Sequence, residues 1–290
     1  MRKRKIVPFS FLIIFFFIYL QPALSIASES TPLFRIDRIN ILVLFIIFCA
    51  VLLLYIRSAR KGKKLFVRKI TGLEAIEEGV GRATEMGRPV LFIPGIDELD
   101  EIQTIAGLSI LSRVARITAQ YSTPLKVPVN YPLVLAAAQE SIRGAYLDAG
   151  KGDDYTPDMA QYVAGEQFAF VAAVHGIMHR DKPATNVYMG AFYAESLLLA
   201  EEGQASGAIQ IAGTANPEQL PFFIAACDYT LMGEELFAAS SYLSKESLML
   251  GSLKGQDWMK IFLVICILLG VIFETLNIGG GFLYKLFIEH

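Results

Sequence analysis

Three apolar segments at the two ends of the chain constrain its fold more than any other feature. They cover residues 11–20, 39–56 and 259–278, whereas residues 71–257 mix polar and apolar residues. The hydrophobic content of 54% exceeds the roughly 45–50% of average globular proteins, which disfavours a wholly soluble chain. The same composition excludes a disordered chain, which would be poor in apolar residues.

Residues 1–27 have the features of a secretory signal peptide. Basic residues from Arg2 to Lys5 precede the apolar run, and the small residues Ser25 and Ala27 would allow cleavage after Ala27. The alternative is an uncleaved first membrane helix. Both alternatives place residue 57 and the residues after it on the same side of the membrane.

Residues 39–56 form an uncharged run of 18 residues, long enough to cross a bilayer as a transmembrane helix. A basic juxtamembrane collar follows at residues 57–70, with Arg57, Arg60, Lys61, Lys63, Lys64, Arg68 and Lys69. Because cytoplasmic loops carry an excess of Lys and Arg, the collar predicts a cytoplasmic main domain at a cell inner membrane of bacterial type. It would also attract anionic membrane lipid, at roughly 1 kcal/mol per basic residue near the surface.

Residues 259–278 predict a further transmembrane helix, which the glycines 279–281 would end. Trp258 and Lys260 suit an anchor at the membrane interface. Glu274 lies near the far end, where an interfacial position and a role in transport are both open. The tail 279–290 is too short to return across the membrane and is expected on the outer side.

The predicted cytoplasmic domain, residues 71–257, is strongly acidic. It contains 11 Lys and Arg against 24 Asp and Glu, a net charge of −13, although the whole chain has a net charge of −2. Since binding to phosphates needs a basic surface, we expect no nucleic-acid partner. The chain has three cysteines and no CxxC spacing, which disfavours structural disulfides and thiolate metal clusters.

Short apolar strands alternate with helices along this domain. Strands are predicted at residues 90–93, 125–129, 186–189, 208–212 and 229–232, and helices at 73–86, 102–117, 133–149, 192–204, 217–227 and 234–243. Residues 158–180 are predicted to be mostly helical, and Pro128 places its strand near a sheet edge. The alternation predicts an α/β fold with a mainly parallel sheet, helices on both faces in Rossmann-like layering, and flanking transmembrane helices.

In open parallel sheets, ligands bind beyond the carboxyl ends of the strands. Polar residues follow several predicted strands, and five of them are candidate ligand-binding residues: Asp97, Asn130, Thr214, Asn216 and Glu234. Ordinary turns and helix caps use the same residue types, so a purely structural role explains them equally well. No phosphate-loop or dinucleotide-binding fingerprint is present, so the sequence assigns no cofactor.

His175 and His179 are four residues apart, so on a helix they share one face and form a candidate metal site. Asp181 or Glu195 would supply a further ligand. Packing or hydrogen bonding is the simpler explanation, because Gly176 stands where the H-E-x-x-H motif has glutamate. No complete catalytic set of residues stands out, and the catalytic residues stay unassigned.

Residues 213–223 (GTANPEQLPFF) and 228–235 (DYTLMGEE), with the earlier segment 92–95 (FIPG), form a distinctive pattern. The pattern resembles an uncharacterised prokaryotic family of membrane-anchored proteins with a domain of unknown function. The resemblance implies a membrane-anchored domain, and it brings no activity, cofactor or catalytic residue.

The sequence therefore predicts a membrane-anchored cytoplasmic binding or assembly module, which forms homo-oligomers or binds a membrane-protein partner. The alternative is an enzyme or sensor that binds a small ligand at the strand ends. Convergence of the five candidate residues on one pocket would favour the alternative. Their dispersal over the surface, beside an exposed apolar helix face, would favour assembly.

Overall fold

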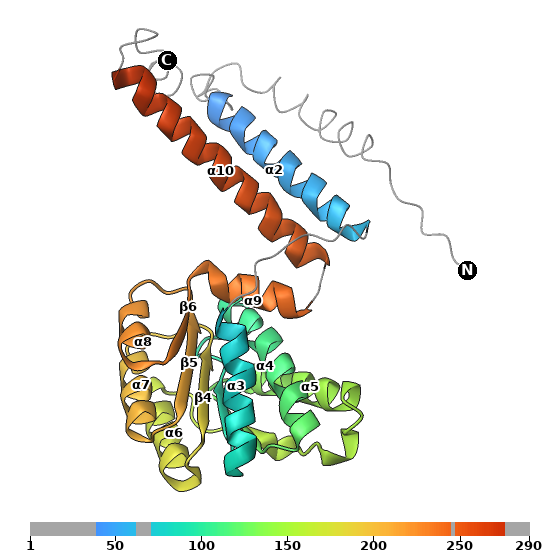
Figure 1. Ribbon diagram of the computed structural model, residues 1–290, viewed down its shortest axis with the longest axis vertical. Coiled ribbons are helices and arrows are strands. Elements are labelled where there is room, and N and C mark those ends of the chain that lie inside the picture. Colours follow the sequence, from blue (N-terminus) through green and yellow to red (C-terminus); the bar gives the residue numbers. More distant parts are fainter. Residues whose placement is uncertain (1–38, 62–70, 245–246, 276–290) are drawn as a thin grey trace, which may run out of the picture. The chain divides into compact units, whose positions relative to one another are not determined.

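Figure 1 shows a computed structural model of the protein, which describes residues 39–61, 71–244 and 247–275. The predicted signal at 1–27, most of the collar at 57–70 and the tail at 279–290 lie outside the described residues. The chain divides into two compact units, with boundaries after residue 54 and after residue 254. One unit holds most of the two long apolar helices, and the other, residues 55–254, holds an α/β domain.

Helix α2 spans Ile39–Arg60 and helix α10 spans Ser247–Thr275, so both are longer than the apolar runs alone predict. Within them, Ile41–Arg60 and Gly251–Ile272 are long and apolar enough to cross a membrane. Large apolar side chains are exposed along both helices, and exposed apolar surface of this extent marks contact with a membrane or another protein.

Two glycines of α10 pack against α2. A Cβ atom added at Gly255 would lie 3.1 Å from the Cα of Leu52, and one added at Gly251 would lie 2.6 Å from the Cα of Ile56. The glycines are four residues apart and share one face, as in the small-xxx-small contacts of membrane helices. Because the later glycine meets the earlier residue of α2, the two helices are antiparallel.

The α/β domain is built on a sheet of six parallel strands, which confirms the predicted fold class. The strands are β1 (Val90–Ile93), β2 (Leu125–Val129), β3 (Ala160–Tyr162), β4 (Thr185–Met189), β5 (Ile209–Thr214) and β6 (Tyr229–Met232). Their spatial order is β3-β2-β1-β4-β5-β6. This order is the one found in doubly wound dinucleotide-binding folds, with a reversal between β1 and β4.

Helices cover both faces of the sheet (Figure 1). One face carries α3 (Thr71–Met86), α4 (Ile102–Tyr121), α5 (Pro132–Asp148) and α9 (Glu234–Ser244), and the other carries α6 (Gln167–Asp181), α7 (Glu195–Ala205) and α8 (Leu220–Ala226). Side chains alternate along a strand, so each face has its own core. In β1, Val90 and Phe92 belong to one core, and Leu91 and Ile93 belong to the other.

Residues 160–162 correct the prediction of a mostly helical segment at 158–180. They form the edge strand β3, and α6 begins only at Gln167. Consequently β2 lies between β1 and β3 and is not itself the edge strand. Pro128 pairs with Gln161 of β3 and lies beyond Leu125 and Lys126, the residues of β2 that pair with β1. Because proline has no backbone N–H, this position avoids the loss of a hydrogen bond between β1 and β2.

Candidate functional site

All six strands are parallel, so their carboxyl ends meet at one edge of the sheet, which we call the carboxyl edge. It consists of the strand-end segments 94–105, 130–136, 163–170, 190–198, 215–222 and 232–238. The strand order reverses between β1 and β4, and doubly wound folds bind their ligands at this switch point. The carboxyl edge around β1 and β4 is therefore the candidate functional site.

The loops after β1 and β4 contact each other through their backbones at the switch point. The Ile96 N–H donates a 3.0 Å hydrogen bond to the Ala191 carbonyl, which joins the loop after β1 to the loop after β4. Gly95 has φ +89°, and a Cβ there would lie only 2.6 Å from the same carbonyl oxygen. Only glycine fits this close approach, so the sequence itself permits the two loops to meet.

A tyrosine and an aspartate link the same two loops through their side chains. The Tyr193 hydroxyl, after β4, donates a 2.7 Å hydrogen bond to Asp97 Oδ2, after β1. This bond to a carboxylate, with a smaller contribution from burial, raises the pKa of Tyr193 to about 12. Asp97 thus has a partner within the protein, and Tyr193 stays protonated at any physiological pH.

Glu195 is fully buried beside this pair and holds α6 to the loop after β4. Its Oε1 accepts a 2.8 Å hydrogen bond from the Tyr193 N–H, and its Oε2 accepts one from Gln167 Nε2. Burial raises the pKa of Glu195, and these hydrogen bonds partly offset the effect because they favour the ionised form.

Gln103, in the first turn of α4, joins the end of β5 to α4. Its Oε1 accepts hydrogen bonds from the Ala215 N–H at 2.7 Å and from the Thr214 hydroxyl at 3.2 Å. Its Nε2 donates to Asn216 Oδ1 at 2.8 Å. The Asn216 amide in turn donates to the Phe192 carbonyl after β4 at 2.7 Å, so the segments that follow β1, β4 and β5 form one hydrogen-bonded unit.

Four of the five candidate ligand-binding residues take part in these contacts at the carboxyl edge. Besides Asp97, Thr214 and Asn216, they include Asn130, whose Nδ2 donates a 2.5 Å hydrogen bond to the Ile96 carbonyl. The Asn130 Oδ1 is buried and has no hydrogen-bond partner among the described residues. The fifth candidate, Glu234, begins α9 at the same edge, two strands away from the switch point. Ligand binding by these five residues stays a prediction.

No sequence pattern points to Gln103 or Tyr193, although both are central to the hydrogen bonding of the carboxyl edge. Their partners lie about a hundred positions away in the chain, so only the fold brings them together. Glu195, considered from the sequence as a further metal ligand, is a buried acceptor for Tyr193 and Gln167.

His175 and His179 lie on α6 and contact α7 at separate points. His175 Nε2 is 3.2 Å from the Leu198 carbonyl, and His179 Nε2 is 2.8 Å from Glu202 Oε1. Both contacts tie α6 to α7, and metal binding by this pair stays a prediction.

The two proposed additional metal ligands are engaged elsewhere. Asp181 accepts a 2.6 Å hydrogen bond from Lys126 Nζ, and Glu195 is bound as described above. Asp181 has a lowered pKa, because the pairing with Lys126 and Arg180 outweighs the opposing effect of burial. Across residues 39–61, 71–244 and 247–275, no group of three or more His, Cys, Asp or Glu side chains is arranged to hold a metal ion.

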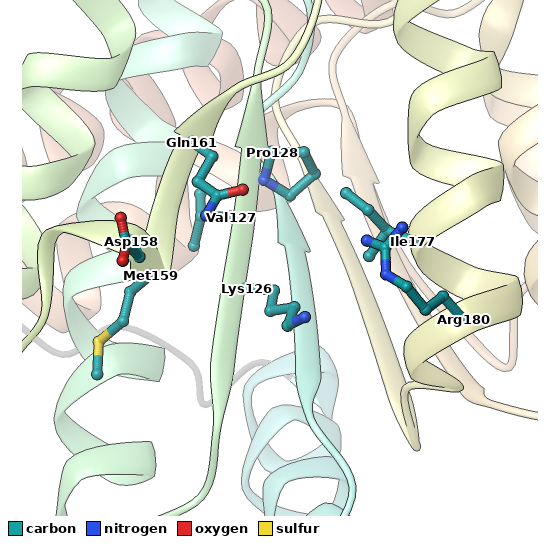
Figure 2. Close-up of a pocket in the computed structure, with 8 residues that line it drawn as sticks. All are labelled: Lys126, Val127, Pro128, Asp158, Met159, Gln161, Ile177 and Arg180. Atoms are coloured by element: carbon teal, nitrogen blue, oxygen red, sulfur yellow. The ribbon is translucent and has the colours of Figure 1, made fainter.

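A small pocket lies away from the carboxyl edge. Figure 2 shows its lining from β2, β3, α6 and the turn before β3: Lys126, Val127, Pro128, Asp158, Met159, Gln161, Ile177 and Arg180. Its volume of about 40 Å³ has room for water, whereas ligand pockets usually measure about 300–1,000 Å³. Because Lys126 already pairs with Asp181, the pocket does not present an unpaired lysine to a ligand.

The outer surface of the carboxyl edge combines apolar and acidic side chains. Five apolar or aromatic residues from five different strand ends are at least 45% exposed there: Ile102, Leu133, Phe168, Tyr193 and Met232. Acidic residues recur in the strand-end segments, and none of these segments contains Lys or Arg. The edge therefore offers a surface that is both apolar and negatively charged.

Comparison with known proteins gives one match. The model of a family described as "Domain of unknown function (DUF6754)" matches residues 29–283, which confirms the resemblance to a family of unknown function. No curated protein and no solved structure matches the chain.

Proposed function

We propose that this chain, which belongs to the DUF6754 family, is a membrane-anchored assembly module. In this proposal α2 and α10 act as the transmembrane helices predicted at 39–56 and 259–278. They hold the acidic α/β domain, residues 71–257, on the cytoplasmic side of the cell inner membrane. There the domain associates with further copies of the chain or with a membrane-protein partner.

The hydrogen bonding of the carboxyl edge is the observation that supports assembly most strongly. Ligand sites present polar groups that converge on an open cavity. At this edge, Gln103, Tyr193 and Glu195 direct their polar atoms to neighbouring loops of the same domain. The side chains that remain outward are largely apolar or acidic, and exposed apolar patches are typical of interaction surfaces.

The antiparallel packing of α2 and α10 supports the anchoring. Two antiparallel spans bring the end of α2 and the start of α10 to the same side of a membrane, as a domain inserted between them requires. The basic residues that follow the apolar part of α2, beginning with Arg57 and Arg60, favour the cytoplasmic side.

Labelling of single cysteines tests the orientation. Asp153 is exposed on the α/β domain, so Asp153→Cys is introduced into a chain whose three native cysteines are replaced by serine. A membrane-impermeant maleimide should label this site only after the cells are permeabilised. Labelling in intact cells, with a cytoplasmic marker protein still protected, would place the domain on the outer side and refute the orientation.

Native mass spectrometry of the detergent-solubilised chain tests assembly against the alternative of a ligand-binding enzyme or sensor. Assembly predicts a dimer or larger species without a retained small molecule. The alternative predicts a bound small molecule that is lost in Asn216→Ala, because Asp97, Thr214 and Asn216 lie in adjoining loops. A strictly monomeric chain that retains no partner protein would contradict the assembly function.

A further inference from the structure

We propose that the carboxyl edge receives the basic end of α2 from a second copy of the chain. This inference rests on the proposed assembly function and names the two surfaces that meet. The acidic surface is formed around Glu98 and Asp100, in the loop after β1. The basic surface is formed by Arg57, Arg60 and Lys61.

The acidic half of this contact is accessible and has an apolar surround. Glu98 and Asp100 are exposed, and they precede Ile102, which is 66% exposed at the start of α4. Leu133, after the neighbouring strand β2, is 64% exposed. Apolar area would supply affinity for a partner segment, and the carboxylates would select a basic one.

The basic half belongs to the same chain and is also accessible. Arg57 and Arg60 occupy the last turn of α2, Lys61 follows them, and all three are exposed. Four more Lys or Arg residues follow in the sequence between positions 63 and 69. The charges of the two surfaces are therefore complementary.

The connection between the surfaces makes a meeting of two copies feasible. Ten residue steps separate Lys61 from Thr71 at the start of α3, and an extended chain spans at most about 33–36 Å over that length. Gly72 lies against Leu231 of β6, next to the carboxyl edge. This length sets only an upper limit on the separation of the two surfaces within one copy, and it leaves the basic end of α2 free to reach the acidic edge of a second copy in the same membrane.

An anionic lipid surface fits this edge less well than a basic segment does. The inner leaflet carries a negative surface potential, which attracts Lys and Arg and repels carboxylates. The strand-end segments contain carboxylates and no Lys or Arg, so their approach to such a surface is opposed by charge. A positively charged protein segment, such as the end of α2, is attracted to these carboxylates.

Charge reversal in the full-length chain tests the contact. Copies labelled with donor and acceptor dyes are mixed in neutral detergent, and the dissociation constant is measured by energy transfer. Glu98→Lys with Asp100→Lys should weaken association by about tenfold or more at low salt. The matched control, Asp148→Lys with Asp153→Lys, changes two exposed residues at the opposite edge by the same charge and should stay within about twofold of the unaltered chain.

A mixture of two variants identifies the partner. Arg57→Glu with Arg60→Glu should also weaken self-association, and mixing this variant with Glu98→Lys/Asp100→Lys should restore association between the two. Unchanged association of Glu98→Lys/Asp100→Lys would overturn the inference and leave the assembly function standing. Restoration only when all four changes share one chain would also overturn it, because the contact would then be intramolecular. Monomeric behaviour of the unaltered chain would instead refute self-association, the form of the assembly function on which this inference rests.

Discussion

Tyr193 and Asp97 join the two loops of the switch point through a hydrogen bond of 2.7 Å between residues that are 96 positions apart in the chain. The same loops are joined through backbone by Ile96 and Ala191. A doubly wound sheet normally opens a crevice at this point for its ligand. In this protein the two loops are hydrogen-bonded to each other at this point, and this contact is one reason for proposing assembly.

Removal of the Tyr193 hydroxyl should loosen the switch point. We expect Tyr193→Phe to lower the free energy of unfolding by about 0.5–1 kcal/mol, the low range for a hydrogen bond, because the side chain is 45% exposed. Denaturant unfolding in detergent measures the loss. Tyr121→Phe is the control, since Tyr121 is an exposed tyrosine at the other edge of the sheet, and it should leave the stability unchanged.

The stabilisation by Tyr193 should depend on pH in one direction. Its pKa is raised from 10.0 to about 12, so the folded state retains the proton longer than the unfolded state. The stabilisation is therefore complete below pH 10 and is lost as the pH rises towards 12. The stability difference between the unaltered chain and Tyr193→Phe should be constant from pH 7 to 9 and shrink above pH 10. A difference that persists undiminished to pH 12 would contradict the assigned hydrogen bond.

Glu195 should tolerate an amide better than a truncation. Glu195→Ala leaves the partly buried Tyr193 N–H and Gln167 amide without their acceptor, which should cost about 1–3 kcal/mol of unfolding free energy. Glu195→Gln keeps an acceptor for the Tyr193 N–H, and its NH2 group can donate to the Gln167 Oε1 once the Gln167 amide turns over. It carries no buried charge, so it should retain near-normal stability at pH 7. Equal loss in both variants would refute the acceptor role.

The raised pKa of Glu195 also predicts a pH trend. A carboxyl group whose pKa is higher in the folded state than its ordinary value of 4.5 favours folding when it is protonated. This contribution is present below pH 4.5 and is lost as the pH rises through the raised pKa of the folded state. Relative to Glu195→Gln, the unaltered chain should therefore gain stability as the pH falls from 7 towards 4.5. A relative loss over that range would show that the ionised form is the stabilised one.

The hydrogen bonds of Gln103 should hold the segment after β5 in a fixed conformation. Gln103→Ala removes the acceptor of the Ala215 N–H and the donor to Asn216, which should cost about 1–3 kcal/mol. Hydrogen exchange should accelerate at Ala215, while exchange in the central strand β4 should change only in line with global stability. Unaltered exchange at Ala215 would contradict the role of Gln103 as the link between α4 and β5.

The two glycines of α10 should differ in their tolerance of alanine. An added methyl group at Gly251 would lie 2.6 Å from the Ile56 Cα, whereas one at Gly255 would lie 3.1 Å from the Leu52 Cα. Thermal unfolding in detergent should therefore show a larger loss for Gly251→Ala than for Gly255→Ala. Gly144→Ala, in α5 with open space at the added atom, is the control and should be neutral or stabilising by about 0.5–1 kcal/mol. The reverse order of the two α10 variants would contradict the observed packing.

The parts of the fold that were predictable are those with strong local patterns. The apolar runs at 90–93 and 125–129 and the helical spacing after them correspond to β1, β2, α4 and α5. β3 was missed because Ala160–Tyr162 has three residues and no apolar run of its own. Ala160–Tyr162 is a strand because it pairs with β2, and neither segment has a local sequence pattern that predicts this pairing.

The candidate site was predictable in position and not in its contacts. Asp97, Asn130, Thr214 and Asn216 follow strands, so a parallel sheet alone brings them to one edge. Their hydrogen-bond partners, Gln103 for Thr214 and Tyr193 for Asp97, follow from the strand order and from the course of α4 over the sheet. Such contacts are long-range and leave no periodic signal in the sequence.

Counting the copies in a native membrane tests the central claim most directly. The full-length chain, carrying one fluorescent label per copy, is extracted with its surrounding lipid into polymer-bounded discs, and single discs are photobleached. An assembly module predicts two or more bleaching steps in most discs at low expression. The proposed contact between the carboxyl edge and the basic end of α2 further predicts a shift to single steps in Glu98→Lys/Asp100→Lys. Single steps in the unaltered chain, at label occupancy verified with a known dimer, would contradict an assembly of two or more copies.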